Sequence, residues 1–242
     1  RNNTAVGSQA LLANVDGTHN MALGYYALKT NVSGGFNTAV GANAAQAVIL
    51  DNVTAVGRQA LAAASGADST AVGYNALATN TGAQNTAVGS QALTANIGGT
   101  PNTAMGYYAL KTNTTGTHNT AMGANALLTN LGGARDTAVG SSALQTNSSG
   151  NDNTGIGYGA LSANDTGYSN SALGAYTLSL NAGGYQNTAL GYYALGANTS
   201  NANSTAVGYY ALKLNTAGGN TAVGASALAA NVAAGNDTAV GY

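Results

Sequence analysis

The side chains that could perform acid–base or metal chemistry are few and far apart in this chain. Its 242 residues include two histidines, His19 and His118, seven aspartates, and no glutamate or cysteine. The histidines share one phase of a repeat and are six copies apart, so stacked copies would separate them by about 30 Å. An isolated aspartate between repeats more often caps a turn than binds a metal. We therefore expect no catalytic residue, no metal site and no cofactor.

Motifs of known enzyme sites are also missing. The sequence has no glycine-rich phosphate loop ending in lysine, and no nucleophile beside a base. It also lacks the glycine–aspartate nonapeptide that binds calcium in repeat toxins. A carbohydrate-cleaving enzyme would need two acids roughly 5–10 Å apart, which scattered aspartates do not supply. We predict that the protein is not an enzyme.

The chain is built almost entirely from one repeated phrase, Asn-Thr-Ala-Val-Gly or a close relative. A fixed short period is typical of a solenoid, in which each coil buries its apolar face only against its neighbours. The sequence predicts a parallel β-solenoid of about fifteen coils, with one short strand per coil at Thr-Ala-Val-Gly. The intervals are all 16 or 17 residues, and the copies begin at Thr4, Met21, Thr38, Thr54, Thr70, Thr86, Thr103, Thr120, Thr137, Thr154, Ser171, Thr188, Thr205, Thr221 and Thr238.

The third position of every copy is aliphatic or methionine, and we expect this column to face the interior. Side chains alternate across a strand, so the flanking Ala and Gly columns would then point outward. An exposed apolar strip usually marks a contact, so we predict chain–chain contacts at Ala87, Gly89, Ala138 and Gly140. The alternative for glycine is a positive φ at the end of the strand. The core column is predicted to include Val6, Val40, Val56, Val72, Val88, Met105, Met122, Val139, Val207 and Val223.

The second half of each coil reads Gly-x-x-Ala-Leu-x-x-Asn, a spacing typical of a helix. A single helical turn would bury both Ala and Leu, and we favour it over a second short strand. The closing Asn recurs in twelve of fourteen coils, with Val48 and Ala64 as exceptions. It can cap a turn or form an internal ladder of amides, and either role is structural. The predicted Asn column includes Asn14, Asn31, Asn80, Asn96, Asn113, Asn130 and Asn147.

Two further columns are candidates for recognition. A row of threonines would suit ice binding, but it shares the strand face of the aliphatic column, so we expect it to turn inward or to a corner. Tyrosine pairs such as Tyr107-Tyr108 follow the Gly column. Tyrosine is common in binding surfaces, although packing between neighbouring coils or chains is the interpretation that we favour.

Composition excludes several classes of protein. The chain has six Lys and Arg against seven Asp, a net charge of −1, so it lacks the basic surface of a nucleic-acid binder. No apolar stretch approaches the roughly 20 residues of a transmembrane helix, and the N-terminus has no signal-peptide pattern. Regularly placed aliphatic residues argue against disorder. We predict a single repeat rod over residues 1–242, about 70 Å long, which is a segment of a longer fibre.

The phrase Asn-Thr-Ala-Val-Gly-x-x-Ala-Leu-x-x-Asn resembles repeats in bacteriophage tail-fibre proteins and large bacterial surface proteins. It is more distantly similar to the head repeats of trimeric autotransporter adhesins, whose coils are shorter and lack the Ala-Leu-x-x-Asn half. The resemblance covers the whole chain, and it implies a homotrimer of parallel chains.

These observations predict a structural rod of an extracellular fibre, on a virion or a cell surface, that is used for attachment. The expected partners are further copies of the chain, in a homotrimer or filament, with host or cell-surface glycans contacted through other regions. Neither nucleic acid nor membrane insertion is expected. The alternative is a repetitive surface that binds glycan or ice.

Overall fold

The computed structural model is an all-β parallel solenoid with about 17 residues per coil, as the sequence predicts. It describes residues 2–232 and 234–242. The fold divides into two compact units, Arg1–His118 and Asn119–Tyr242, which are described separately. The prediction of one continuous rod stays a prediction.

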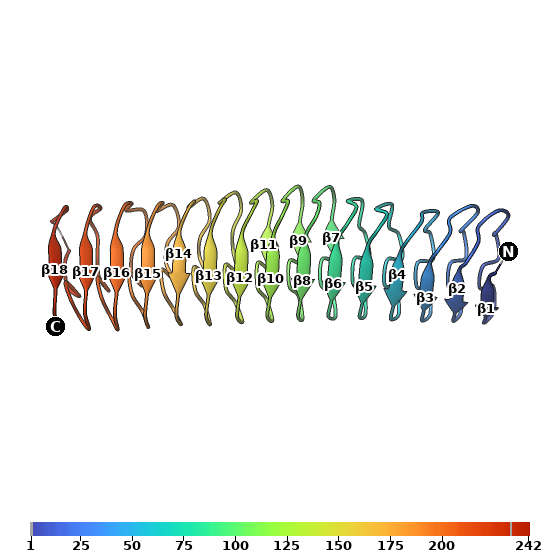
Figure 1. The fold of residues 1–242 in the computed structure, drawn as a ribbon, viewed down its shortest axis with the longest axis horizontal. Helices are drawn as coiled ribbons and strands as arrows, with labels where there is room; N and C mark the ends of the chain where they lie inside the picture. The colour runs from blue at the N-terminus through green and yellow to red at the C-terminus, as the bar shows by residue number, and fades with distance from the viewer. Residues whose placement is uncertain (1, 233) are drawn as a thin grey trace. The chain divides into compact units, whose positions relative to one another are not determined.

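In unit 1, seven strands pair in chain order, each parallel to the next and in register, so that Thr54 pairs with Thr70 and Val56 with Val72. Figure 1 shows these strands side by side, one from each coil. They are β1 (Thr4–Val6), β2 (Met21–Leu23), β3 (Thr38–Val40), β4 (Thr54–Val56), β5 (Thr70–Val72), β6 (Thr86–Val88) and β8 (Thr103–Met105).

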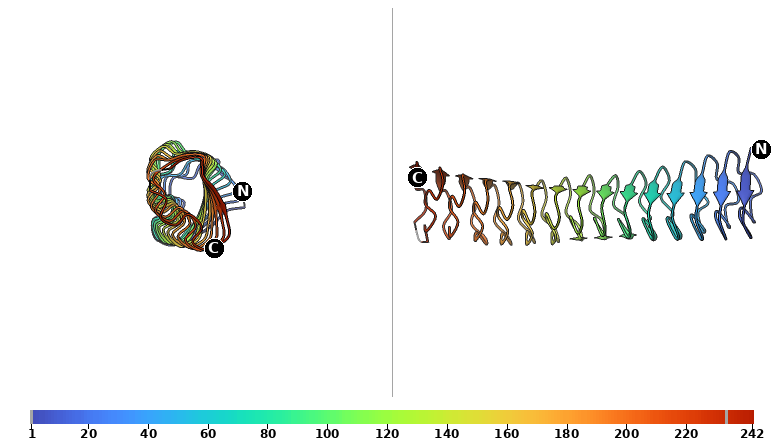
Figure 2. Two further views of the ribbon diagram at one scale, coloured as in Figure 1. Left: turned by 90° about the vertical axis from the view of Figure 1, so that its left-hand side faces the viewer. Right: turned by 90° about the horizontal axis from the view of Figure 1, so that it is seen from below.

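Unit 2 repeats this arrangement with eight strands, again parallel and in register. Within each unit, successive strands are rotated relative to one another (Figure 2), as is usual for β-sheets. The strands are β10 (Thr120–Met122), β12 (Thr137–Val139), β13 (Thr154–Ile156), β14 (Ser171–Leu173), β15 (Thr188–Leu190), β16 (Thr205–Val207), β17 (Thr221–Val223) and β18 (Thr238–Val240).

The favoured helical turn in the second half of the coil is wrong, because no described residue is helical. Instead, tight turns follow the strands. In the coil that begins at Thr86, Ala92 N donates to Gly89 O (3.3 Å), and both Gln91 and Leu93 have positive φ, of 58° and 47°. The left-handed residues reverse the chain so that Ala92 and Leu93 both point inward and are fully buried.

The alternative of a second short strand holds in three coils, at β7 (Ala95–Asn96) and β9 (Thr112–Asn113) in unit 1 and β11 (Thr129–Asn130) in unit 2. Elsewhere on this wall, single backbone hydrogen bonds join neighbouring coils. Leu77 N, for example, donates to Ala92 O at 3.0 Å. Both walls of each unit are therefore bonded from coil to coil.

The orientation predicted for the strands is wrong, because the Ala column faces the interior. Ala87 and Ala138 are fully buried, whereas Val88 is 36% exposed. The interior opposite the strand is already filled by leucine. At Gly155, which replaces Ala in one coil, an added Cβ would lie 3.4 Å from Leu144 Cγ. A methyl group at this strand position therefore already lies in van der Waals contact with the leucine column.

The predicted core column consequently lies on the outside of the solenoid. Its members are exposed or half-buried side chains that point away from the leucine column, namely Val6, Val40, Val56, Val72, Val88, Met105, Met122, Val139, Val207 and Val223. The buried apolar core consists instead of the strand Ala column and the Ala-Leu pairs of the turns.

Candidate functional site: the outward face of the strands

The outward face of the strands carries two parallel rows of side chains, which we call the strand face. One row holds the first residue of each three-residue strand, usually threonine, and the other holds the third, which is aliphatic or methionine. Because the strands pair in register, each row continues from coil to coil within a unit. Neither row contains a charged residue in the described strands.

The threonine row does not turn inward, the first of the two positions expected for it. In the central strands the threonines are half-buried and share the outward side with the aliphatic row. Among the hydrogen bonds of the described residues, none uses the hydroxyl of a threonine in a three-residue strand. These hydroxyls are therefore available to solvent or to a partner.

A shallow groove of about 290 Å³ lies on the strand face of unit 2, across β13, β14 and β15. Ala172 and Ala189 form its floor. The aliphatic row carries Ile or Leu in all three of these strands, and Leu173 is 49% exposed. The two rows thus form the walls of the groove, which is lined by Thr154, Ile156, Ser171, Leu173, Thr188 and Leu190.

The four predicted contact residues do not lie together on the surface. Ala87 and Ala138 are wrong as chain–chain contacts, since no partner can reach a fully buried methyl group. Gly89 and Gly140 are half-buried and end their strands with φ of 139° and 128°. A Cβ at Gly140 would also lie 2.6 Å from Gly157 O. The glycine column is thus explained by backbone conformation and by the close approach of the next coil.

The Asn column forms a ladder inside the solenoid. Asn96 Nδ2 donates to Asn80 Oδ1 at 2.7 Å in the preceding coil, and to Gly99 O at 2.8 Å in its own loop. Asn31 Oδ1 has no donor, because Val48 takes the Asn position in the next coil. Asn14 is half-buried, and the fully buried members include Asn31, Asn80, Asn96, Asn113, Asn130 and Asn147.

A second interior ladder, which the sequence analysis missed, uses the residue before each strand. Asn153 Oδ1 accepts the backbone N–H of Asn170 at 3.1 Å, and Asn153 Nδ2 donates to Gly167 O at 2.9 Å. The signal is visible in the sequence, because the repeated phrase starts with Asn in most copies. Members of this column include Asn20, Asn37, Asn85, Asn102, Asn119, Asn153, Asn170 and Asn187.

Asp136 replaces asparagine in this second ladder. The side chain is fully buried; its Oδ1 accepts from Asn153 N and its Oδ2 from Asn147 Nδ2, both at 2.8 Å. Burial raises the pKa of Asp136 to about 7, and the nearby charge of Asp152 adds to this effect. On the surface, a hydrogen bond from Arg135 lowers the pKa of Asp152. Asp136 is part of the wall of the coil, and it is not among the residues that line the groove across β13–β15.

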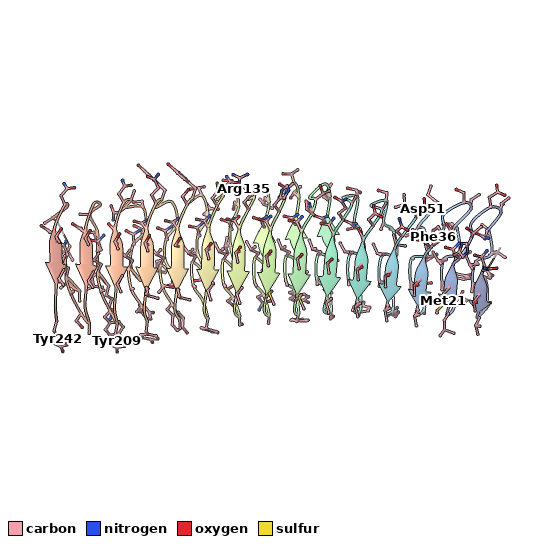
Figure 3. The ribbon with its side chains drawn as sticks, in the orientation of Figure 1. Met21, Phe36, Asp51, Arg135, Tyr209 and Tyr242 are labelled. Carbon is pink, nitrogen blue, oxygen red and sulfur yellow. The ribbon has the colours of Figure 1, made fainter. Side chains whose placement is uncertain are left out.

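Tyrosines form clusters beyond the C-terminal ends of the strands, where Figure 3 shows Tyr209. Tyr192 and Tyr209 stack with ring centroids 5.7 Å apart, and Lys213 lies 4.2 Å from the ring of Tyr210. In unit 1, the Lys111 ammonium is 4.0 Å from the Tyr108 ring. The hydrogen bond with Tyr107 is the main cause that lowers the pKa of Tyr108. Contacts between rings of neighbouring coils agree with the packing interpretation, while Tyr107 and Tyr209 stay 50% and 52% exposed.

No cluster of potential metal ligands occurs among residues 2–232 and 234–242. No three His, Cys, Asp or Glu side chains there lie close enough to hold a metal ion. His19 stacks on Phe36 at 4.8 Å, and His118 has a φ of 60°. The same part of the chain contains no helix that is long and apolar enough to cross a membrane.

Comparisons with family models, with curated proteins and with solved structures find no match to the chain.

Proposed function

We propose that this chain is a structural shaft of an extracellular fibre, on a virion or a cell, and that it serves attachment by spacing other parts of the fibre. One observation carries the proposal: the same interior bonds recur in almost every coil. The amide bond from Asn164 to Asn147 (2.9 Å), for example, is repeated one coil later from Asn181 to Asn164 (2.8 Å).

Repetition of this kind suits a mechanical element. A coil that bonds only to its two neighbours can be added or removed without redesigning the rest. A recognition site, in contrast, needs a local arrangement that differs from its surroundings. The strand face repeats one pattern in every coil, an aliphatic residue or Met in one row and usually Thr in the other, which supports the role of a spacer.

The test is to change the number of coils in the intact fibre. Duplicating residues 120–237 adds seven coils, and this should lengthen the fibre by about 34 Å. Fibre length is measured by electron microscopy, and attachment is measured with the particle or cell that carries the fibre. We expect a longer fibre with attachment preserved. If the longer fibre folds correctly but no longer attaches, these coils do more than hold other parts of the fibre apart.

A second candidate function is ice binding, which the row of threonine hydroxyls without protein partners favours. In-register strands repeat these hydroxyls every ~4.8 Å, a regular array that could order water. The purified chain would then retard ice growth, and replacing Thr154, Thr188 and Thr205 by valine would remove that effect.

A further inference from the structure

We infer that the strand face of unit 2 is the surface through which a second copy of this chain binds, with the groove across β13–β15 at its centre. This inference rests on the proposed function, because a fibre shaft works as an assembly. It also moves the contact from the predicted Ala and Gly columns, since the Ala column is buried, to the Thr and aliphatic rows.

The first argument is the amount of exposed apolar surface. Ile156, Leu173 and Leu190 stand side by side in consecutive strands and are 36%, 49% and 42% exposed. Soluble monomers rarely leave a continuous apolar strip of this kind uncovered. The eight strands of unit 2 present two outward residues each, sixteen in all, and a standard interface uses about 20–30 residues a side. The strand face of this unit alone supplies most of such an interface.

The second argument is self-complementarity. Identical copies related by symmetry bring equivalent patches close together, so a row of one charge would repel its own image. The strand face has no charged residue, and the charged side chains of unit 2 lie outside it, such as Arg135 paired with Asp152 and Lys213 against the ring of Tyr210. When the strand faces of two copies meet and lose their water, no charged side chain of these strands is therefore buried in the contact.

The third argument is the period of the two rows. A ridge of aliphatic side chains that repeats once per coil meshes continuously only with a groove of the same period. A second copy has that period by construction, whereas an unrelated protein does not. Ice is a weaker fit, because the aliphatic row changes among Val, Ile, Leu and Met and because successive strands are rotated relative to one another (Figure 2).

The experiment places charge at the centre of the proposed contact. The variant Leu173→Lys/Leu190→Lys is compared with Leu180→Lys/Leu214→Lys, a matched double variant at leucines that are 54% and 44% exposed but lie outside the strands. Mass in solution is measured by sedimentation over a wide concentration range, and the fold by circular dichroism. Opposed like charges should weaken association about a hundredfold or more, while the matched variant associates like the parent.

The conservative variant Leu173→Val/Leu190→Val controls for shape, and it should keep most of the association because valine already fills this row in other coils. Equal association of the parent and both lysine variants would overturn the inference. A parent chain that is a folded monomer at all concentrations would also overturn the inference. The proposed function as a fibre shaft would then still be tested separately, by coil duplication. If the chain is a monomer and also retards ice growth, the strand face binds ice and not a second copy.

Discussion

At the scale of the residue, Asp136 is the side chain whose chemistry differs most from its column. Its neighbours in the same ladder, Asn119 and Asn153, fill the position with an uncharged amide. Asn119 Oδ1 accepts from Asp136 N at 2.9 Å, so the backbone contacts of the ladder continue through the aspartate. The charge, however, is held inside the coil, where a carboxylate is destabilised by loss of water.

This charge predicts an unusual dependence of stability on pH. The pKa of Asp136 is about 7 in the folded chain against 3.8 for the free group, so between these values the folded state binds a proton that the unfolded state does not. The free energy of unfolding should therefore fall as pH rises from about 4 to 7, by a few kcal/mol. It should be constant above that window, and Asp136→Asn should remove the effect.

Thermal unfolding between pH 5 and pH 8 measures this dependence. The control is Asp165→Asn, at an exposed aspartate of the same unit, which should keep the pH profile of the parent. Identical profiles for Asp136→Asn and the parent would contradict the prediction, because another group would then be responsible.

At the scale of the element, hydropathy alone predicts the wrong side of the strand to be buried. Valine is more apolar than alanine, yet Ala138 is buried and Val139 is half-buried. The opposite wall explains this, because the buried leucine of each turn already lies in van der Waals contact with a methyl group on the strand. The strand contributes small side chains to the interior and keeps its larger ones for the outside.

Exchanging sizes across the strand tests this orientation. Ala138→Val adds two methyl groups to a filled interior, and overpacking of this kind typically costs about 1–3 kcal/mol. Val139→Thr keeps the shape on the outward side and should change the free energy of unfolding by less than about 0.5 kcal/mol. Both are measured by urea denaturation of the purified chain. A larger loss for Val139→Thr would mean that the strand faces the other way.

At the scale of the whole molecule, coil number and phase should decide whether the chain folds. Deleting residues 154–170 removes one full period of 17 residues and joins Asn153 to Ser171, which keeps the Asn-Thr/Ser junction of the repeat. The shortened chain should fold, with a denaturant m-value reduced roughly in proportion to the surface removed.

The matched control deletes only residues 154–161, about half a coil. This deletion joins Asn153 to Ser162, so residues of the turn occupy the strand position and the two Asn ladders lose their register. We expect loss of the cooperative unfolding transition, recorded by circular dichroism. Equal stability of the two deletions would show that phase is not what specifies the stack.

The sequence by itself determined the solenoid, its period and the phase of every coil. Each of these follows from spacing along the chain, because identical segments at a constant interval can stack only in register. It also indicated the Asn column, since an amide that returns at one phase meets its own copy in the next coil.

Tertiary structure alone decided which side of the strand faces inward. Alternation fixes that Thr86 and Val88 share one side and Ala87 takes the other, but the choice between the sides depends on the distance to the opposite wall. Leu93 sets that distance, through a left-handed turn with a φ of 47° that the helical spacing of the sequence concealed. Thr, Val and Met rows therefore became a surface available to a partner, because a leucine elsewhere in the coil had filled the space within.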